Sequence, residues 1–198
     1  MELTLALGRS VGFAVGAGVN LYATVLVAGL AARFGWVDLP HGFEVLGSGW
    51  VIGGAAALYL VEFVADKVPW VDTAWDALHS IVRPLGAAAL AVLALGPADP
   101  GVQVVAGLLG GAVGASTHAA KAGTRVAVNA SPEPASNVLV SLAEDGFVVG
   151  LVVLLLTHPW LGVAAALLAL TAVLAVLLLL LRAVRRRRGS RGVAAPYS

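Results

Sequence analysis

The stretch that decides the fold is residues 62–83, EFVADKVPWVDTAWDALHSIVR, in which charged side chains interrupt an otherwise apolar chain. A second stretch of the same kind, HAAKAGTRVAVNASPEPASNVLVSLAED, covers residues 118–145. Both stretches lie inside or at the ends of segments long enough to cross a membrane. An ionisable group in hydrocarbon costs several kcal/mol unless it is paired or hydrated, so such groups normally mark a functional interior.

The composition assigns the chain to the integral membrane proteins. Of the 198 residues, 60% are hydrophobic and 12% are charged, and the mean hydropathy is +0.94. A soluble domain of this length cannot hide that much apolar surface from water. The sequence contains no cysteine, which excludes disulfides, thiolate metal sites and cysteine nucleophiles.

The pattern of apolar runs predicts an all-α, polytopic membrane bundle of about six transmembrane helices. Because a span needs about 20 apolar residues, we expect the first span at residues 10–32, with no break. The second span covers about 50–64, the third begins near Asp72 and ends before the turn PADPG at 97–101, and the fourth runs to about 128. The fifth covers 136–157 and the sixth 161–181. The predicted transmembrane domain is 1–183, and the predicted disordered tail is 184–198.

The distribution of basic residues predicts the orientation. Six of the twelve lysines and arginines lie in the last seventeen positions, and this tail is typical of a cytoplasmic segment that contacts anionic lipid headgroups rather than nucleic acid. With six spans, both termini are then cytoplasmic. The tryptophans form two belts, with Trp36, Trp50 and Trp160 at the outer interface and Trp70 and Trp75 at the inner one.

Polar residues on the second to fifth spans recur at intervals of three and four, so each set follows one helical face. Asn20 lies at similar depth on the first span. We therefore expect two charged hairpins that open to the cytoplasm and share a polar interior. The predicted pathway residues are Asn20, Glu62, Asp66, Asp76, His79, Arg83, His118, Lys121, Arg125, Asn137, Ser141, Glu144 and Asp145. Arg83 should be neutralised inside the bundle by Glu62, Glu144 or Asp145.

Glycines at four-residue spacing form a second pattern. Gly107 and Gly111, and Gly110 and Gly114, make two small-xxx-small pairs on the fourth predicted span. Such pairs let helix backbones approach closely in membranes, so we expect packing faces there.

The strings GVNLYATVLVAGLAARFG, LYLVEFVADKVPWVDTAWDALHSIVRPLGAAALA and the second charged stretch resemble a family of small bacterial membrane proteins described as domain of unknown function 4126. The resemblance reaches nearly to the arginine tail. It implies a multi-pass membrane domain in the bacterial inner membrane and brings no activity, cofactor or partner.

Three functions are consistent with these residues. The leading hypothesis is a transporter or channel-like protein for a small ion or solute, in which a net acidic interior favours cations. The alternatives are a membrane enzyme acting on a lipid headgroup and a structural scaffold subunit, and a homo-oligomer is compatible with each. A divalent cation is the one candidate cofactor, with hard ligands from Glu62, Asp66, Asp76, His79, His118 and Glu144, although Arg83, Lys121 and Arg125 oppose a purely cationic site.

Overall fold

A computed structural model describes residues 2–37, 39–129 and 134–192. The described residues form helices and connecting turns, without strands. The elements are α1 (Glu2–Val19), α2 (Leu21–Phe34), the 3-10 helix η1 (His41–Gly47), α3 (Gly49–Ala65), α4 (Pro69–Leu95), α5 (Pro100–Asn129), α6 (Pro134–Thr157) and α7 (Pro159–Gly192). The expectation of an all-α membrane bundle is confirmed, and the turn expected at 97–101 separates α4 from α5.

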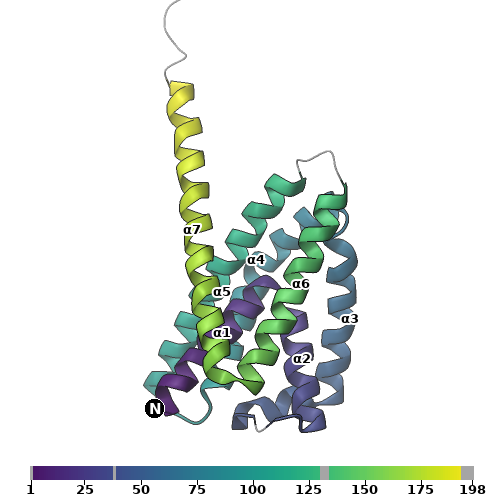
Figure 1. Cartoon of the computed structure of the whole chain (residues 1–198), viewed down its shortest axis with the longest axis vertical. Coiled ribbons are helices and arrows are strands. Elements are labelled where there is room, and N and C mark those ends of the chain that lie inside the picture. The colour runs from purple at the N-terminus through teal and green to yellow at the C-terminus, as the bar shows by residue number, and fades with distance from the viewer. Residues whose placement is uncertain (1, 38, 130–133, 193–198) are drawn as a thin grey trace, which may run out of the picture.

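The prediction of one continuous first span was wrong, because the chain breaks at Asn20 into α1 and α2. Asn20 has extended backbone angles (φ −147°, ψ 100°), and its side chain accepts a hydrogen bond from the amide of Ala23, which caps α2. The start of α1 and the residues after α2, such as Glu2 and His41, line one common cavity. The two helices therefore form a hairpin whose tip reaches into the bundle and whose open end faces one side (Figure 1).

This break changes the number of crossings. Four described helices, α4 to α7, are long and apolar enough to cross a membrane, and η1 with α3, bent by 70°, makes a fifth candidate span. By length and composition, the described residues therefore contain four or five candidate spans, where the sequence predicts about six. The start of α1 lies at one end of the bundle and the end of α7 at the other (Figure 1), unlike the expected arrangement with both ends on one side. We call the end with the start of α1 the hairpin end.

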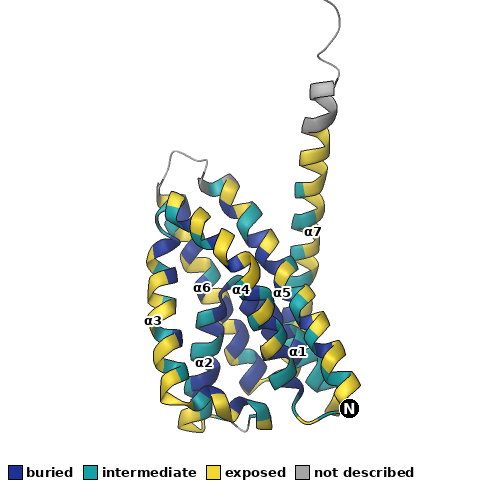
Figure 2. Cartoon of the chain, turned by 180° about the vertical axis from the view of Figure 1, so that it is seen from behind, coloured by how far each residue is buried: buried dark blue, intermediate teal, exposed yellow. Residues whose placement is uncertain are grey.

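α1 occupies the centre of the bundle. Its residues from Gly12 to Gly18 are buried against neighbouring helices (Figure 2), and Phe13 packs against Phe43 of η1 with ring centroids 4.8 Å apart and the rings tilted by 54°. Small residues permit this packing: a Cβ on Gly18 would lie 2.7 Å from the carbonyl oxygen of Gly114 on α5.

α7 lies on the outside of the bundle (Figure 1). Only 6% of its most apolar 18-residue stretch is buried. It continues past residue 183 as far as Gly192, so the predicted tail begins within this helix, and residues 193–198 lie outside the described part of the chain. The string NASPEP at 129–134 predicts a further turn, and four of its six residues, 130–133, are also outside the described part.

The α4–α5 contact confirms the packing role expected for Gly110 and Gly114. A Cβ on Gly110 would collide with the Cβ of Ala91, and one on Gly114 with the Cβ of Ala87. α4 and α5 therefore touch through their backbones, which is the contact that small-xxx-small pairs allow.

We expect Gly114→Ala to lower stability by about 1–3 kcal/mol, because overpacking forces two helix backbones apart. Thermal unfolding in detergent, followed by circular dichroism, measures the effect. Gly150→Ala is the matched control, since Gly150 lies in the interior of α6 and a Cβ there meets open space. Equal melting temperatures for the two variants would contradict the close α4–α5 contact.

Candidate functional site

The charged residues of the two sequence stretches come together in one place. They lie on the last turn of α3, the first half of α4, the second half of α5 and the first half of α6, and the tip of the α1–α2 hairpin meets them from the other side. We call this set the polar network. It consists of Asn20, Glu62, Asp66, Lys67, Asp72, Asp76, Arg83, His118, Lys121, Arg125, Asn137, Glu144 and Asp145.

Arg83 on α4 is one centre of the polar network and is fully buried. Its Nη2 lies 2.9 Å from Oε1 of Glu62, and its Nη1 lies 3.4 Å from Oδ1 of Asp76. The same Nη1 donates to Nδ1 of His118 at 2.8 Å. His118 therefore carries its proton on Nε2, which donates to the backbone oxygen of Asp76 at 3.0 Å. The expected neutralisation of Arg83 is confirmed for Glu62, and Asp76 takes the second place instead of Glu144 or Asp145.

Arg125 on α5 is the second centre. Its Nη2 lies 3.0 Å from both Oδ2 of Asp66 and Oε2 of Glu144, and its Nη1 donates to Oδ1 of Asn137 at 2.7 Å. Asn137 in turn donates to the backbone oxygen of Asp66 at 3.0 Å. Arg125 thus ties the α3–α4 turn to α6.

Lys121 connects the two centres. Its Nζ lies 3.1 Å from Oδ2 of Asp66, 3.5 Å from Oε2 of Glu144 and 3.7 Å from Oε1 of Glu62. It also donates to the backbone oxygen of Val19 at 3.2 Å. That oxygen belongs to the last residue of α1, where helix carbonyls lack partners and the helix dipole is negative. The broken helix therefore supplies a backbone acceptor to the charged interior.

Asn20 attaches the hairpin tip to α6. Its Nδ2 donates to Oδ1 of Asp145 at 3.0 Å, while its Oδ1 accepts from the amide of Ala23. One buried side chain thus caps α2 and donates a hydrogen bond to a buried carboxylate.

His79 and Ser141 lie beside the main ion pairs. His79 donates from Nδ1 to the backbone oxygen of Trp75 at 2.8 Å, so its Nε2 accepts from the hydroxyl of Tyr22 at 2.9 Å. Ser141 accepts from Nζ of Lys67 at 3.3 Å. All thirteen predicted residues therefore gather in one region.

Sequence reasoning left four contributors out of the predicted site. Asp72 and Lys67 stand in the sequence close to the expected loop between the second and third predicted spans, where charges are typically solvated, yet Asp72 is fully buried and Lys67 is half-buried. Tyr22 and the carbonyl of Val19 carried no sequence signal, because they act only once the first span is broken.

The charges of the polar network do not balance. Six carboxylates face four basic groups, a formal excess of two negative charges with both histidines neutral. The buried carboxylate oxygens that accept no hydrogen bond from the described residues include Oε2 of Glu62, Oδ1 of Asp66, Oε2 of Glu144 and Oδ2 of Asp145. Among those residues, no group of three or more His, Asp or Glu side chains has the geometry to hold a metal ion, so the divalent cation proposed from the sequence gains no support.

The electrostatic setting is clearest at Asp66, in the turn between α3 and α4. Burial opposes its ionisation, but Lys121 and Arg125 outweigh burial, so the pKa of Asp66 lies below its ordinary value. Asp66 therefore stabilises the fold while it is charged, and this contribution disappears only as the pH falls through the lowered pKa.

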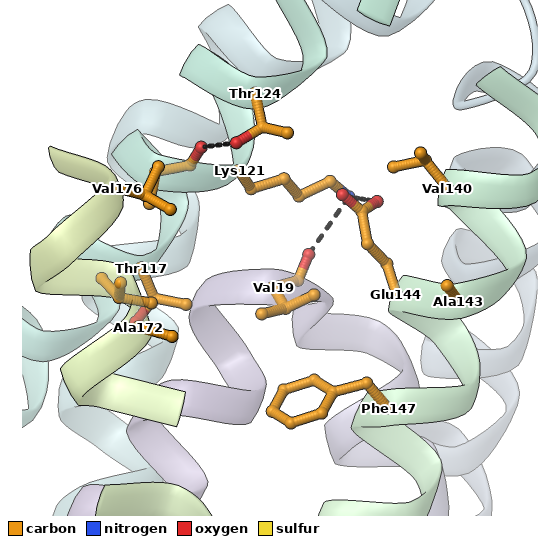
Figure 3. A pocket seen from close by; sticks show the side chains of 12 residues that line it. Val19, Thr117, Lys121, Thr124, Val140, Ala143, Glu144, Phe147, Ala172 and Val176 are labelled. Carbon is orange, nitrogen blue, oxygen red and sulfur yellow. Dashed lines mark hydrogen bonds and ion pairs between the residues drawn. The ribbon is translucent and has the colours of Figure 1, made fainter. Parts of the chain in front are cut away.

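Two cavities reach the polar network from different sides. One, of about 370 Å³, lies between α5, α6 and α7, and Lys121 and Glu144 are in its wall (Figure 3). The other, of about 170 Å³, lies between α4 and α5, and Asp72, Asp76 and Arg125 are in its wall. The ion pair of Arg125 with Glu144 joins the walls of the two cavities.

We expect Arg83→Ala to destabilise the protein by about 3–5 kcal/mol, because it leaves Glu62 and Asp76 as uncompensated buried charges. Arg33→Ala, which removes an exposed arginine at the end of α2, is the control and should melt like the unaltered protein. The double variant Arg83→Met with Glu62→Met should recover part of the loss. Thermal unfolding in detergent measures all three, and an unchanged melting temperature for Arg83→Ala would refute the buried pair.

The comparisons with known proteins give a family and no further relative. The family model described as Domain of unknown function (DUF4126) matches residues 6–180 of the chain. No curated protein matches the chain, and no solved structure matches it. Because the match covers most of the chain, this multi-pass membrane protein belongs to the DUF4126 family.

Proposed function

We propose that this protein transports a small cation across the membrane and that the polar network is the site through which the cation passes. The observation that supports the proposal best is the excess of two carboxylates deep in the bundle, together with buried carboxylate oxygens that accept no hydrogen bond from a described residue. Excess negative charge and free acceptor oxygens in a low-dielectric interior attract a cation or protons.

The position of the polar network supports the same function. Glu144 lies ten residues into α6, about 15 Å along the helix at 1.5 Å per residue, which is near the middle of a bilayer. Glu144 and Lys121 lie in the wall of the cavity between α5, α6 and α7. Asp72 and Asp76 lie in the wall of the cavity between α4 and α5. Broken helices that end at a midplane site are a recurring arrangement in membrane transporters, and α1 and α2 end at this depth.

The basic side chains then act as internal counter-ions. Lys121 has four partners within 4 Å, three of them carboxylates. A cation that binds Glu62 or Glu144 weakens the pull of that carboxylate on Lys121, and the amine turns toward Asp66. Such an exchange of partners lets the site accept and release a charge without ever leaving the amine unpaired.

We further propose that the hairpin end faces the outside and that the other end, with the arginines of α7, faces the cytoplasm. Arg182, Arg185 and Arg186 are exposed at the far end of α7, where the positive-inside rule and anionic headgroups both favour the cytoplasmic membrane surface. Trp50 and Trp160 begin helices at the hairpin end, whereas Trp70 lies at the other. With five crossings, the N-terminus is then external and the C-terminal arginines are cytoplasmic.

Single cysteines test this orientation, since the chain has none of its own. We expect Leu3→Cys and His41→Cys to react with a membrane-impermeant maleimide on intact spheroplasts and Ser190→Cys to react only after lysis. Leu3 and His41 are exposed at the hairpin end. Protection of position 3 with labelling of position 41 would restore a transmembrane first helix and six crossings.

Flux in proteoliposomes tests the transport function. We expect the protein to carry H⁺, Na⁺ or K⁺, and Glu144→Gln or Glu62→Gln to lower that flux by about tenfold, the effect of losing ~1.4 kcal/mol of interaction in the pathway. Both variants should also change the pH dependence of flux, because each removes a titratable group. Glu44→Gln, on the exposed face of η1, is the matched control and should leave the flux unchanged.

A structural role is the second candidate, and the extent of pairing favours it. Arg83, Lys121 and Arg125 each contact at least two carboxylates. Absence of flux for all three cations, together with a loss of stability in Glu144→Gln, would replace transport with this function.

A further inference from the structure

We propose that the cavity between α5, α6 and α7 binds an amphiphile with a protonated amine at its polar end, which reaches the cavity from the hydrocarbon region of the membrane. The cavity has a volume of about 370 Å³, within the range of about 300–1,000 Å³ common for small-molecule sites. The proposal concerns binding, and it holds whether or not the protein transports a cation.

The walls of this cavity have two chemical parts. Most of the lining is apolar, with Phe147, Val140 and Val176 among the larger side chains, and Lys121 and Glu144 form a polar end (Figure 3). The lining residues of α7, 172–176, lie at the middle of its membrane-length segment. A ligand at this depth must have an apolar body.

Glu144 is the charged side chain that a ligand in this cavity contacts. Its side chain is 16% exposed, whereas that of Lys121 is 3% exposed. The ion-pair contacts of Glu144 to Lys121 and Arg125, at 3.5 and 3.0 Å, are made by Oε2, and this buried oxygen accepts no hydrogen bond from the described residues. Lys121 already contacts Val19, Asp66, Glu144 and Glu62, so its N–H groups are committed. The polar end of the cavity therefore offers a hydrogen-bond acceptor, and it favours a ligand that carries a hydrogen-bond donor.

Thr117 adds a second polar group to the wall of the cavity. It lines the cavity, it is 1% exposed, and its hydroxyl has no hydrogen-bond partner among the described residues. A buried hydroxyl without a partner is costly, and a ligand N–H satisfies it. An alkyl ammonium group, charged at neutral pH, supplies N–H donors to both Glu144 and Thr117, and a charge-assisted bond to Glu144.

The test uses the full chain in phosphatidylcholine nanodiscs and a decylamine probe that carries a diazirine on its alkyl chain. After illumination and digestion, mass spectrometry should place the label on residues 117–124, 140–147 and 172–176. An excess of decylamine should lower this labelling by about tenfold, while decanol should not, because a charge-assisted bond distinguishes the two by about that factor.

Matched variants on α6 separate the cavity from the general lipid surface. Ala143→Trp fills the cavity and should abolish the protected labelling, whereas Leu142→Trp, on an exposed position next to it, should not. Repeating the experiment in nanodiscs with an ethanolamine phospholipid identifies the source of the amine: reduced labelling assigns it to membrane lipid, and unchanged labelling assigns it to a free amine. Equal labelling of Ala143→Trp and Leu142→Trp, or equal competition by decanol, would overturn the proposal.

Discussion

The interaction on which the rest of the structure depends is the neutralisation of Arg83, Lys121 and Arg125 by carboxylates inside the bundle. A charge moved from water into a low-dielectric interior loses hydration worth several kcal/mol even after relaxation. Apart from Arg83 and Asp76, which pair within α4, the ion pairs of these bases join different elements: the partners of Arg125, for example, come from the α3–α4 turn and from α6. The ion pairs therefore fix the relative positions of α3, α4, α5 and α6 in a membrane, where apolar contacts alone discriminate poorly between packings.

The α1–α2 hairpin follows from the same constraint. A helix that ends within the bundle leaves backbone carbonyls without partners, which hydrocarbon does not tolerate. Here the ends face charged side chains: the carbonyl of Val19 accepts from Lys121, and Asn20 caps α2 while donating to Asp145. The hairpin thus supplies hydrogen-bond partners to Lys121 and Asp145. In return, these two side chains satisfy polar groups at the break between α1 and α2. The glycines of α1 complete this arrangement, because they let the hairpin lie at the centre of the bundle.

Much of this architecture could be predicted from the sequence, since membrane-length apolar runs and three-and-four spacing of polar residues are local signals. They identified the helices from α3 onward, the shared polar interior and the partner Glu62 for Arg83. The break at Asn20 could not be predicted in the same way. Residues 10–32 are uncharged and contain no proline, and a lone asparagine is typical both of a polar lining residue and of a helix cap. Only the contact with Asp145, 125 residues away, decides between them.

That single break also decides the electrostatics of the site. In an unbroken first span, Val19 would bond its carbonyl within the helix, and Lys121 would face carboxylates alone. With the helix ended, one N–H of Lys121 is directed to a neutral carbonyl, and the carboxylates keep acceptor capacity that the basic groups do not use, as the unsatisfied oxygens of Glu62, Asp66 and Asp145 show. An interior with two more carboxylates than bases has a negative electrostatic potential, which favours cations over anions. The residues that hold the bundle together are therefore also the ones that make its interior acidic.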